Sequence, residues 1–143
     1  RDLYLRTVEA LEAAGLRQYE ISNFARPGFE SRHNLKYWHC EEYLGFGPSA
    51  HSFFRGERFY RKADWEAFVS GAPVVPDGLG GSFEERLMLA LRLTEGYRGD
   101  IPDELREKAS QPLLRPFLEV GDGFIRLTKE GFLVSNTVIA ELL

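Results

Sequence analysis

The stretch YLRTVEALEAAGLRQYEIS, residues 4–22, decides the fold class that we predict for this chain. Its apolar residues Tyr4, Val8 and Leu11 recur at the spacing of one helical face, and the glycine after them is suited to end a helix. The segment Gln18–Ser22 then alternates apolar and polar residues, as a short strand does. A helix, a tight turn and a strand are half of a βαβ unit, so we expect an α/β fold with a parallel sheet.

Further along, two segments are expected to add strands. Tyr43–Phe46 is a short, mainly apolar run, and Phe53–Arg61 resembles a hairpin that turns at its glycine. Asp64 is placed to cap a short helix. The next segment, Gly71–Gly81, contains two prolines and four glycines, and we predict that it is a loop.

The C-terminal tail has a clearer helical pattern. Ser82 and Glu85 form a capping box, in which each side chain satisfies a free amide at the start of a helix. The apolar face of this helix comprises Phe83, Leu87 and Leu91. We expect Met88 to lie in the core and the helix to stop near Gly96.

The rest of the tail is predicted to hold short helices and one hairpin. Ile101-Pro102 opens a helix, and Pro112 and Pro116 limit the next one, because proline in a helix interior removes a hydrogen bond. Val120–Leu127 contains an Asp-Gly pair typical of a hairpin turn. Thr128 is placed to cap a final helix. The inward face of that helix is expected to comprise Leu133, Val138 and Leu142. This order of elements predicts a small winged-helix-like module.

Composition limits the classes of function. With 143 residues, 43% of them hydrophobic, the chain can form a domain with a buried core. A net charge of −4 argues against general nucleic-acid binding, which needs a surplus of Lys and Arg. No apolar run approaches the roughly 20 residues of a membrane span. The single cysteine, Cys40, cannot form an internal disulfide or hold an iron–sulfur cluster alone. These features are compatible with a cytoplasmic protein.

Three segments are candidates for chemistry, and the first is Tyr19–Gly28. Its polar residues Glu20, Ser22 and Asn23 follow a predicted strand, where α/β folds place ligand contacts. The alternative is that these side chains satisfy only the backbone of their own loop.

The second segment is Arg32–Trp38. On a helix, His33 and Tyr37 share one face, with Asn34 and Trp38 beside them. An imidazole can ligate iron, and aromatic rings can flank a flat porphyrin. The alternative is an aromatic core helix with a hydrogen-bonded histidine, which spacing alone favours.

The third segment is Gly45–Ser52. Its two glycines permit a close backbone approach to a ligand, and Ser49, His51 and Ser52 offer hydrogen-bonding groups. The alternative is a buried turn in a sheet. The segment lacks the endings of a Walker loop or a dinucleotide fingerprint.

Two other residue types give weaker signals. Cys40 lies near His33 in the sequence, and a thiolate can ligate haem. A lone cysteine more often packs as a small apolar side chain, and we favour that role here. A Ser-His-Asp triad cannot be argued, because nothing in the sequence orders Asp64 or Asp77 relative to a histidine.

Taken in order, the three segments resemble one family. Tyr19-Glu-Ile-Ser-Asn-Phe-Ala25, His33-Asn-x-x-Tyr-Trp38 and Tyr43-Leu-Gly-Phe-Gly-Pro-Ser-Ala-His-Ser52 are similar to motifs of the oxygen-independent coproporphyrinogen III oxidase-like radical-SAM proteins, in their haem-chaperone branch. The tail Thr128-x-x-Gly-x-x-x-x-Asn136 fits the same family. The chain also starts at Arg1 without a signal-peptide pattern, so we expect it to be the C-terminal part of a longer protein.

The resemblance implies a fold and cofactors. Residues 1–62 would be the C-terminal strands and helices of an incomplete (β/α) radical-SAM barrel. Residues 63–81 would be a connecting helix and a Pro/Gly-rich loop, and residues 82–143 a small winged-helix-like α+β domain. SAM and a [4Fe-4S] cluster would be bound in the longer protein, whose CxxxCxxC motif is not in this chain.

The resemblance also implies site residues. It ties haem binding to the HNxxYW motif, which here comprises His33, Asn34, Tyr37 and Trp38. His33 would be the ligand of the haem iron, and Ala50 and His51 would lie near the SAM site. No residue is assigned a catalytic role.

We therefore predict a haem chaperone that binds haem and passes it to an acceptor haem protein. One alternative is an enzyme, an oxygen-independent coproporphyrinogen III oxidase (dehydrogenase) that decarboxylates propionates through a SAM-derived radical. Another is a pure interaction module formed by the tail. Nucleic acid is not an expected partner, whereas a membrane-associated acceptor and homo-oligomer formation stay open.

Overall fold

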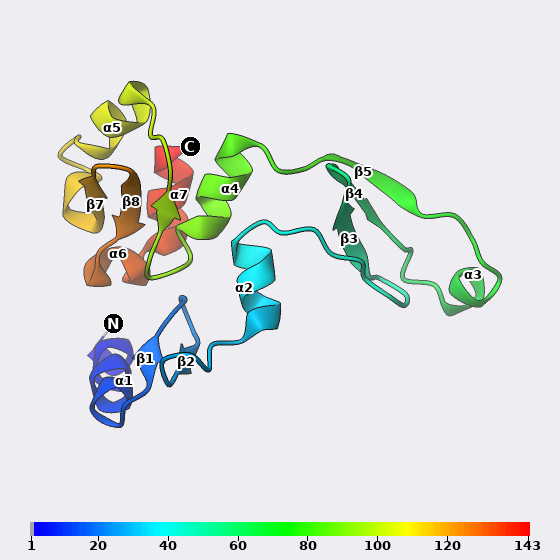
Figure 1. The fold of residues 1–143 in the computed structure, drawn as a ribbon, viewed down its shortest axis with the longest axis horizontal. Helices are drawn as coiled ribbons and strands as arrows, with labels where there is room; N and C mark the ends of the chain where they lie inside the picture. The colour runs from blue at the N-terminus through cyan, green and yellow to red at the C-terminus, as the bar shows by residue number, and fades with distance from the viewer. Residues whose placement is uncertain (1) are drawn as a thin grey trace.

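The chain runs from helix α1 through a protruding sheet to a C-terminal helical module (Figure 1). The computed structural model describes residues 2–143. Helix α1 (Asp2–Ala13) buries Val8, and Gly15 follows it with a φ of +79°, the left-handed conformation of a helix stop. The predicted helix and its glycine turn are therefore confirmed. No described helix is long and apolar enough to cross a membrane.

The predicted parallel sheet is wrong. Two short strands, β1 (Arg17–Gln18) and β2 (Phe24–Ala25), pair in antiparallel orientation. The strand expected at Gln18–Ser22 is cut short because the Tyr19 amide donates to the Asn23 carbonyl and closes a turn. The three sheets of the described chain are all antiparallel.

Helix α2 (Arg32–Trp38) leads towards the second sheet, which has the order β3-β4-β5. Strands β3 (His51–Phe54) and β4 (Glu57–Tyr60) form the predicted hairpin. Strand β5 (Val75–Leu79) lies within the segment expected to be a loop, and that part of the prediction is wrong. The strand tolerates its proline because it lies at the edge of the sheet.

Two local predictions near this sheet have different outcomes. The strand expected at residues 43–46 is reduced to a single bridge between Tyr43 and Phe53. Helix α3 (Trp65–Val69) begins at Asp64 as predicted, and the Asp64 carboxylate accepts an amide hydrogen bond at 2.9 Å within the first turn.

The C-terminal module packs helices around the third sheet, which has the order β6-β8-β7. Its elements are α4 (Phe83–Ala90), β6 (Tyr97–Arg98), α5 (Asp103–Ala109), the 3-10 turn η1 (Arg115–Phe117), β7 (Leu118–Gly121), β8 (Phe124–Leu127), α6 (Lys129–Leu133) and α7 (Ser135–Leu142). The hairpin with an Asp-Gly turn is confirmed. Helix α4 ends at Ala90, well before Gly96, and the predicted final helix is broken at Val134.

The caps of this module follow the sequence with one change. The Ser82 hydroxyl accepts from the Glu85 amide at 3.2 Å, and the Thr128 hydroxyl accepts from the Gly131 amide at 3.0 Å. The Glu85 carboxylate, however, accepts from the Gly81 amide at 2.6 Å rather than from the Ser82 amide. The capping box is therefore displaced by one residue.

The hydrophobic core lies entirely within the C-terminal module. It comprises Leu87, Leu91, Ile101, Leu105, Ala109, Leu114, Leu118, Ile125, Leu127, Phe132, Val138, Ile139 and Leu142. Phe83 packs against it and is partly buried. The prediction that Met88 lies in the core is wrong, because its side chain is 37% exposed on the outer side of α4.

Candidate functional site

Helix α2 carries the HNxxYW motif and stands between the N-terminal elements and the second sheet (Figure 1). It begins at Ser31, whose hydroxyl accepts a hydrogen bond from the Asn34 amide at 3.4 Å. It ends at His39, whose amide donates to the carbonyls of Leu35 and Tyr37. Because the helix has barely two turns, its position depends on the contacts of its side chains.

One side of α2 carries an aromatic series that ends on an exposed imidazole. The ring of His33 meets the ring of Tyr37 edge-on with centroids 4.9 Å apart, and Tyr37 meets Tyr43 in the same way at 4.5 Å. Tyr43 exchanges backbone hydrogen bonds of 2.7 and 3.0 Å with Phe53 of β3. Within residues 2–143, no hydrogen bond engages the ring nitrogens of His33. The series thus joins an accessible imidazole, through Tyr37 and Tyr43, to the second sheet.

Trp38 lies on another side of the helix from His33, because five residues correspond to a rotation of about 140°. The guanidinium of Arg92 lies 5.4 Å from the centre of its ring. Its Nε1 is buried and has no hydrogen-bond partner among the described residues. The residues of the motif therefore do not share one surface. His33 and Tyr37 lie together, whereas Trp38 contacts the C-terminal module. The backbone amide of Asn34 donates to the N-cap side chain of Ser31.

Sequence reasoning missed His39, which follows the motif directly. Its Nε2 lies 2.9 Å from a carboxylate oxygen of Glu95, and its Nδ1 lies 3.9 Å from Glu41. Glu95 is 56 positions away and belongs to the loop between α4 and β6. No local pattern in the sequence indicates this pair. The contact between His39 and Glu95 joins the C-terminal end of α2 to the C-terminal module.

The third segment folds back on itself instead of opening towards a ligand. A Cβ atom at Gly45 would collide with the carbonyl oxygen of His51, so the close backbone approach that this glycine permits is to its own chain. The Gly45 amide donates to the buried hydroxyl of Ser52 at 3.0 Å. This part of the segment is therefore a buried turn, which was the alternative to a ligand-binding loop.

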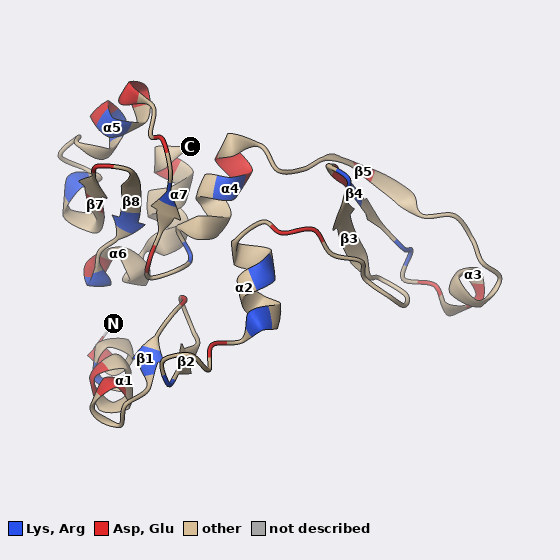
Figure 2. Ribbon diagram, in the orientation of Figure 1, with Lys and Arg blue, Asp and Glu red and all other residues tan. Residues whose placement is uncertain are grey.

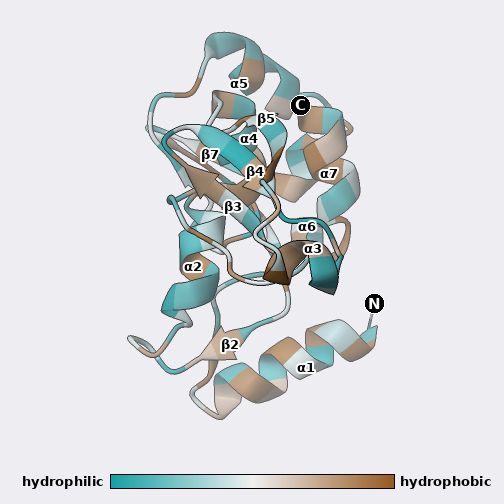
Figure 3. Ribbon diagram, turned by 90° about the vertical axis from the view of Figure 1, so that its right-hand side faces the viewer, coloured by the Kyte–Doolittle hydropathy of each residue, from teal (hydrophilic) through white to brown (hydrophobic). Residues whose placement is uncertain are grey.

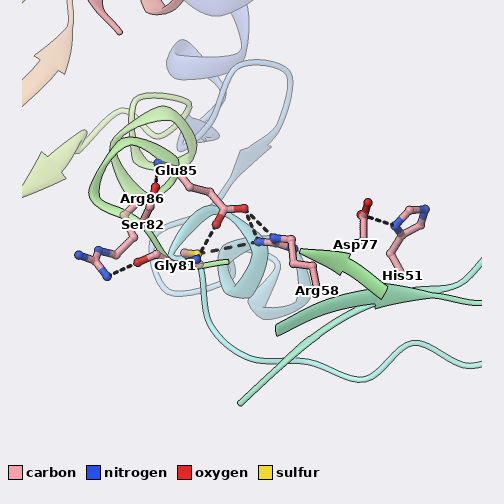
Figure 4. Close-up of polar contacts among 8 residues, drawn as sticks. His51, Arg58, Asp77, Gly81, Ser82, Glu85 and Arg86 are labelled. Carbon is pink, nitrogen blue, oxygen red and sulfur yellow. Dashed lines mark hydrogen bonds and ion pairs between the residues drawn. The ribbon is translucent and has the colours of Figure 1, made fainter. Parts of the chain in front are cut away.

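His51 lies on β3, away from the aromatic series of α2. Its ring stacks on Tyr60 with centroids 5.2 Å apart, and its Nδ1 lies 3.9 Å from Asp77 of β5 (Figure 4). The position of Asp77 relative to a histidine could not be predicted from the sequence, because strand β5 was not predicted. Ala50 contributes backbone groups here, since its carbonyl accepts from the Arg61 amide at 2.9 Å. Among the described residues, no hydrogen bond, ion pair or ring contact joins His51 to α2.

The polar residues of the first segment satisfy their own loop. The buried carboxylate of Glu20 accepts hydrogen bonds from the Ser22 amide at 2.9 Å and from the Ser22 hydroxyl at 3.1 Å. The backbone of Glu20 forms a single bridge with Leu93 of the C-terminal module. A carboxylate that is buried and paired in this way has a structural role.

A junction of charged groups joins the second sheet to α4. Nε and Nη2 of Arg58 lie 2.7 and 2.6 Å from one oxygen of Glu85, whose other oxygen accepts from the Gly81 amide (Figure 4). The Arg58 guanidinium also lies 4.6 Å from the centre of the Phe53 ring. Burial alone would lower the pKa of Arg58, but the neighbouring Glu85 and Tyr43 together raise it above its ordinary value. The Arg58 guanidinium therefore stays charged.

Cys40 lies beside this junction and is unsuited to bind a metal. Its sulfur is 4.0 Å from Nη2 of Arg58. Burial, helped by the Glu85 carboxylate, raises the pKa of the thiol and outweighs the opposite effect of Arg58. The thiolate is the metal-binding form, so a protonated thiol is a poor ligand at neutral pH.

The donor set of the described chain fits a haem iron bound from one side. Among residues 2–143, no group of three or more His, Cys, Asp or Glu side chains is arranged to hold a free metal ion. A haem iron needs only one axial imidazole from this surface, since the porphyrin supplies the equatorial nitrogens. His33 offers such an imidazole, with the Tyr37 ring behind it.

Comparison with curated proteins gives one consistent group. The chain is 31% identical over 163 aligned positions to the haem chaperone HemW of Bacillus subtilis, covering 99% of this chain and 42% of the relative. It is 39% identical over 131 positions to HemW of Synechocystis sp., covering 85% of this chain and 32% of the relative. A stretch of 53 positions, 37% of the chain, is 53% identical to the mitochondrial radical S-adenosyl methionine domain-containing protein 1 of Bos taurus, covering 12% of that protein. The chain thus spans less than half the length of these relatives.

Structural comparison points the same way, although no protein-family model matches the chain. Coproporphyrinogen III oxidase (HemN) of Escherichia coli, described as a radical SAM enzyme, has a TM-score of 0.66 with this structure. The match covers 99% of this chain and 40% of HemN at 16% sequence identity, so it shows a shared fold. By its likeness in sequence to these relatives over nearly its whole length, the chain belongs to the family of the haem chaperone HemW.

Proposed function

We propose that this chain is the haem-binding part of a HemW-type haem chaperone, with His33 as the axial ligand of the iron. The observation that carries the proposal is the state of the His33 ring, which is exposed, has no hydrogen bond within residues 2–143 and rests on Tyr37. Tyr37 packs against Tyr43, so the imidazole is oriented by two aromatic contacts in series. An oriented and accessible imidazole is what axial ligation requires.

The charge of α2 supports the same ligand. The helix carries Arg32 and Lys36 at exposed positions and no acidic residue (Figure 2). The chain as a whole has a net charge of −4, so this basic helix differs from its surroundings. Basic side chains next to His33 would favour a porphyrin that carries propionate carboxylates.

The relatives favour a carrier over an enzyme. Curated proteins named haem chaperone HemW align with 99% and 85% of this chain. We therefore infer delivery of haem to an acceptor haem protein rather than catalysis.

The longer protein would supply the other cofactors. We propose that residues 1–62 form the C-terminal part of a (β/α) barrel in the longer protein. Residues 63–81 would connect this barrel to a winged-helix-like domain formed by residues 82–143. The sheet order β6-β8-β7 with preceding helices supports the last point. The ligands of the [4Fe-4S] cluster would lie outside this chain, because a single cysteine cannot supply them. Ala50 and His51 would face the SAM site.

The winged-helix-like domain is not proposed to bind nucleic acid. In helix-turn-helix proteins, a recognition helix enters the major groove of DNA. In this module the element before the hairpin is η1, three residues long, which is too short for that role. Acidic side chains also outnumber basic ones in residues 82–143.

Haem titration of this chain and three variants tests the proposal. His33→Ala removes the ligand, and we expect a changed Soret band and affinity that falls by about tenfold or more. Tyr37→Phe keeps the ring that supports His33, and we expect binding close to the wild type. His51→Ala, an exposed histidine on β3, is the control and should bind normally. An unchanged spectrum and affinity in His33→Ala would exclude the assignment.

A second measurement separates the carrier from the enzyme. The longer protein would be incubated with coproporphyrinogen III, SAM and a reductant. We expect no protoporphyrinogen to form. Formation of protoporphyrinogen would favour the oxidase.

A further inference from the structure

A cavity of about 270 Å³ lies at the C-terminal end of α2, between this helix, α4 and β6. Two aromatic residues, Trp38 and Tyr97, form part of its wall. Its polar wall residues include Arg86 and Arg98, which come from α4 and β6. The cavity is therefore a separate feature from the surface around His33.

The cavity has an excess of positive charge in an acidic protein. Among the described lining residues, Glu95 is the acidic one, and it is already engaged by His39 at 2.9 Å. The Arg86 guanidinium is fixed by one hydrogen bond from Nη1 to the Gly81 carbonyl at 2.5 Å, which leaves its other nitrogens available (Figure 4). No hydrogen bond or ion pair engages the Arg98 side chain within residues 2–143. Arg86 and Arg98 therefore keep guanidinium donors that no described group accepts.

From this geometry we propose that the cavity binds a carboxylate at the end of a short aliphatic chain. Arg86 and Arg98 would donate charge-assisted hydrogen bonds to the carboxylate oxygens. The rings of Trp38 and Tyr97 would cover the aliphatic part.

The size of the cavity restricts what enters it. Pockets for whole drug-sized ligands have volumes of about 300–1,000 Å³. A cavity of about 270 Å³ admits a carboxylate-bearing arm or a small free carboxylate, but not a macrocycle. The carboxylate-bearing arm would be a propionate of a tetrapyrrole bound to this chain, and this possibility rests on the proposed function. Binding of a small free carboxylate would not depend on the proposed function.

The first experiment uses sodium propionate and its neutral isostere propionamide as probes of the 143-residue chain. We expect saturable NMR shifts of the Gly96 and Arg98 amides with propionate and none with propionamide. Arg98→Gln should weaken propionate binding by about tenfold, because hydrogen bonds to charged groups are the strong ones. Arg115→Gln, at an exposed arginine of η1 outside the cavity, should bind like the wild type. Equal responses to both probes, or an Arg98→Gln variant that binds like the wild type, would overturn the proposal.

The second experiment identifies the source of the carboxylate. Haem and haem dimethyl ester would be titrated into the chain and into Arg98→Gln. If the arm of a tetrapyrrole occupies the cavity, the free acid should bind about tenfold tighter than the ester, and Arg98→Gln should abolish that difference. Equal binding of acid and ester, with propionate shifts retained, assigns the cavity to a free carboxylate. Propionate shifts without any haem binding would refute the proposed function and leave the cavity site standing.

Discussion

Residues 2–81 and residues 82–143 are stabilised in different ways. The second region has a continuous core of thirteen buried hydrophobic residues, which pack together between Leu87 and Leu142. The first region buries three, Val8, Ala25 and Phe53, while large side chains such as Phe46 and Trp65 are exposed. Helix α3, which Figure 3 colours partly as hydrophobic and partly as hydrophilic, lies beyond the end of the sheet, far from the core. The C-terminal region is thus a self-sufficient unit, and the N-terminal region depends on contacts to other elements.

Ile21 packs against the core of the C-terminal region, and polar contacts join other points of the two regions. Arg58 pairs with Glu85, His39 pairs with Glu95, and the Glu20 backbone bridges to Leu93. Polar contacts of this kind stabilise a structure less than a packed hydrophobic core does. Local unfolding is therefore expected mainly where few apolar side chains are buried. The proposed haem ligand, His33, lies in the less buried region.

The largest effect should come from truncating the core of the C-terminal region. Leu87 is fully buried, and we expect Leu87→Ala to lower the free energy of unfolding by about 2–5 kcal/mol. Leu79 of β5 is 86% exposed, so Leu79→Ala should change it by less than about 0.5 kcal/mol. Urea denaturation of both variants measures the difference. Similar losses in the two variants would show that the regions are not stabilised differently.

A smaller effect is expected at the junction between the regions. Arg58 and Glu85 are each 22% exposed and share close hydrogen bonds, so a double-mutant cycle with Arg58→Ala and Glu85→Ala should give a coupling of about 0.5–3 kcal/mol. Hydrogen exchange should rise in β3 and β4 of either single variant and stay low in α7. Additive effects, with unchanged exchange in the sheet, would argue that the junction does not hold the regions together.

Local sequence signals predicted much of the fold. Asp64, Ser82 and Thr128 were correctly identified as helix caps, because the group each side chain bonds lies within three residues. The hairpin with an Asp-Gly turn was found for the same reason. Strand β5 was missed because its pairing with β4 depends on residues far apart, and the glycines and prolines in its sequence resemble a loop. The parallel sheet failed because half of a βαβ unit does not specify the direction of the next strand.

The site was predictable only in part. His33 and Tyr37 share a helical face by spacing, and the structure confirms their contact. Trp38 shares the motif but not the surface, because its environment is set by Arg92 of the C-terminal module. The pairing of His39 joins positions 56 residues apart, which spacing within one helix cannot reveal.

The smallest expected effect concerns Cys40, next to the junction. Burial and the Glu85 carboxylate raise the pKa of its thiol above the ordinary value of 9.0. The folded chain therefore keeps this proton to higher pH than the unfolded chain does. Between pH 9 and the raised pKa, the unfolded state binds fewer protons, so stability falls as pH rises. Below pH 9 both states are protonated, and the contribution is fully present.

Cys40→Ser removes this titration and keeps a similar side chain. We expect the free energy of unfolding of the wild type, relative to Cys40→Ser, to be constant below about pH 9 and to decline as the pH rises above it. Tyrosines also titrate near this range, but they are common to both proteins and cancel in the difference. Alkylation with iodoacetamide at about pH 8 should likewise be slower in the folded chain than in urea, since the thiolate is the reactive form. A difference that stays constant across this range, with equal alkylation rates, would show that the thiol is not buried by the junction and that the two regions separate there.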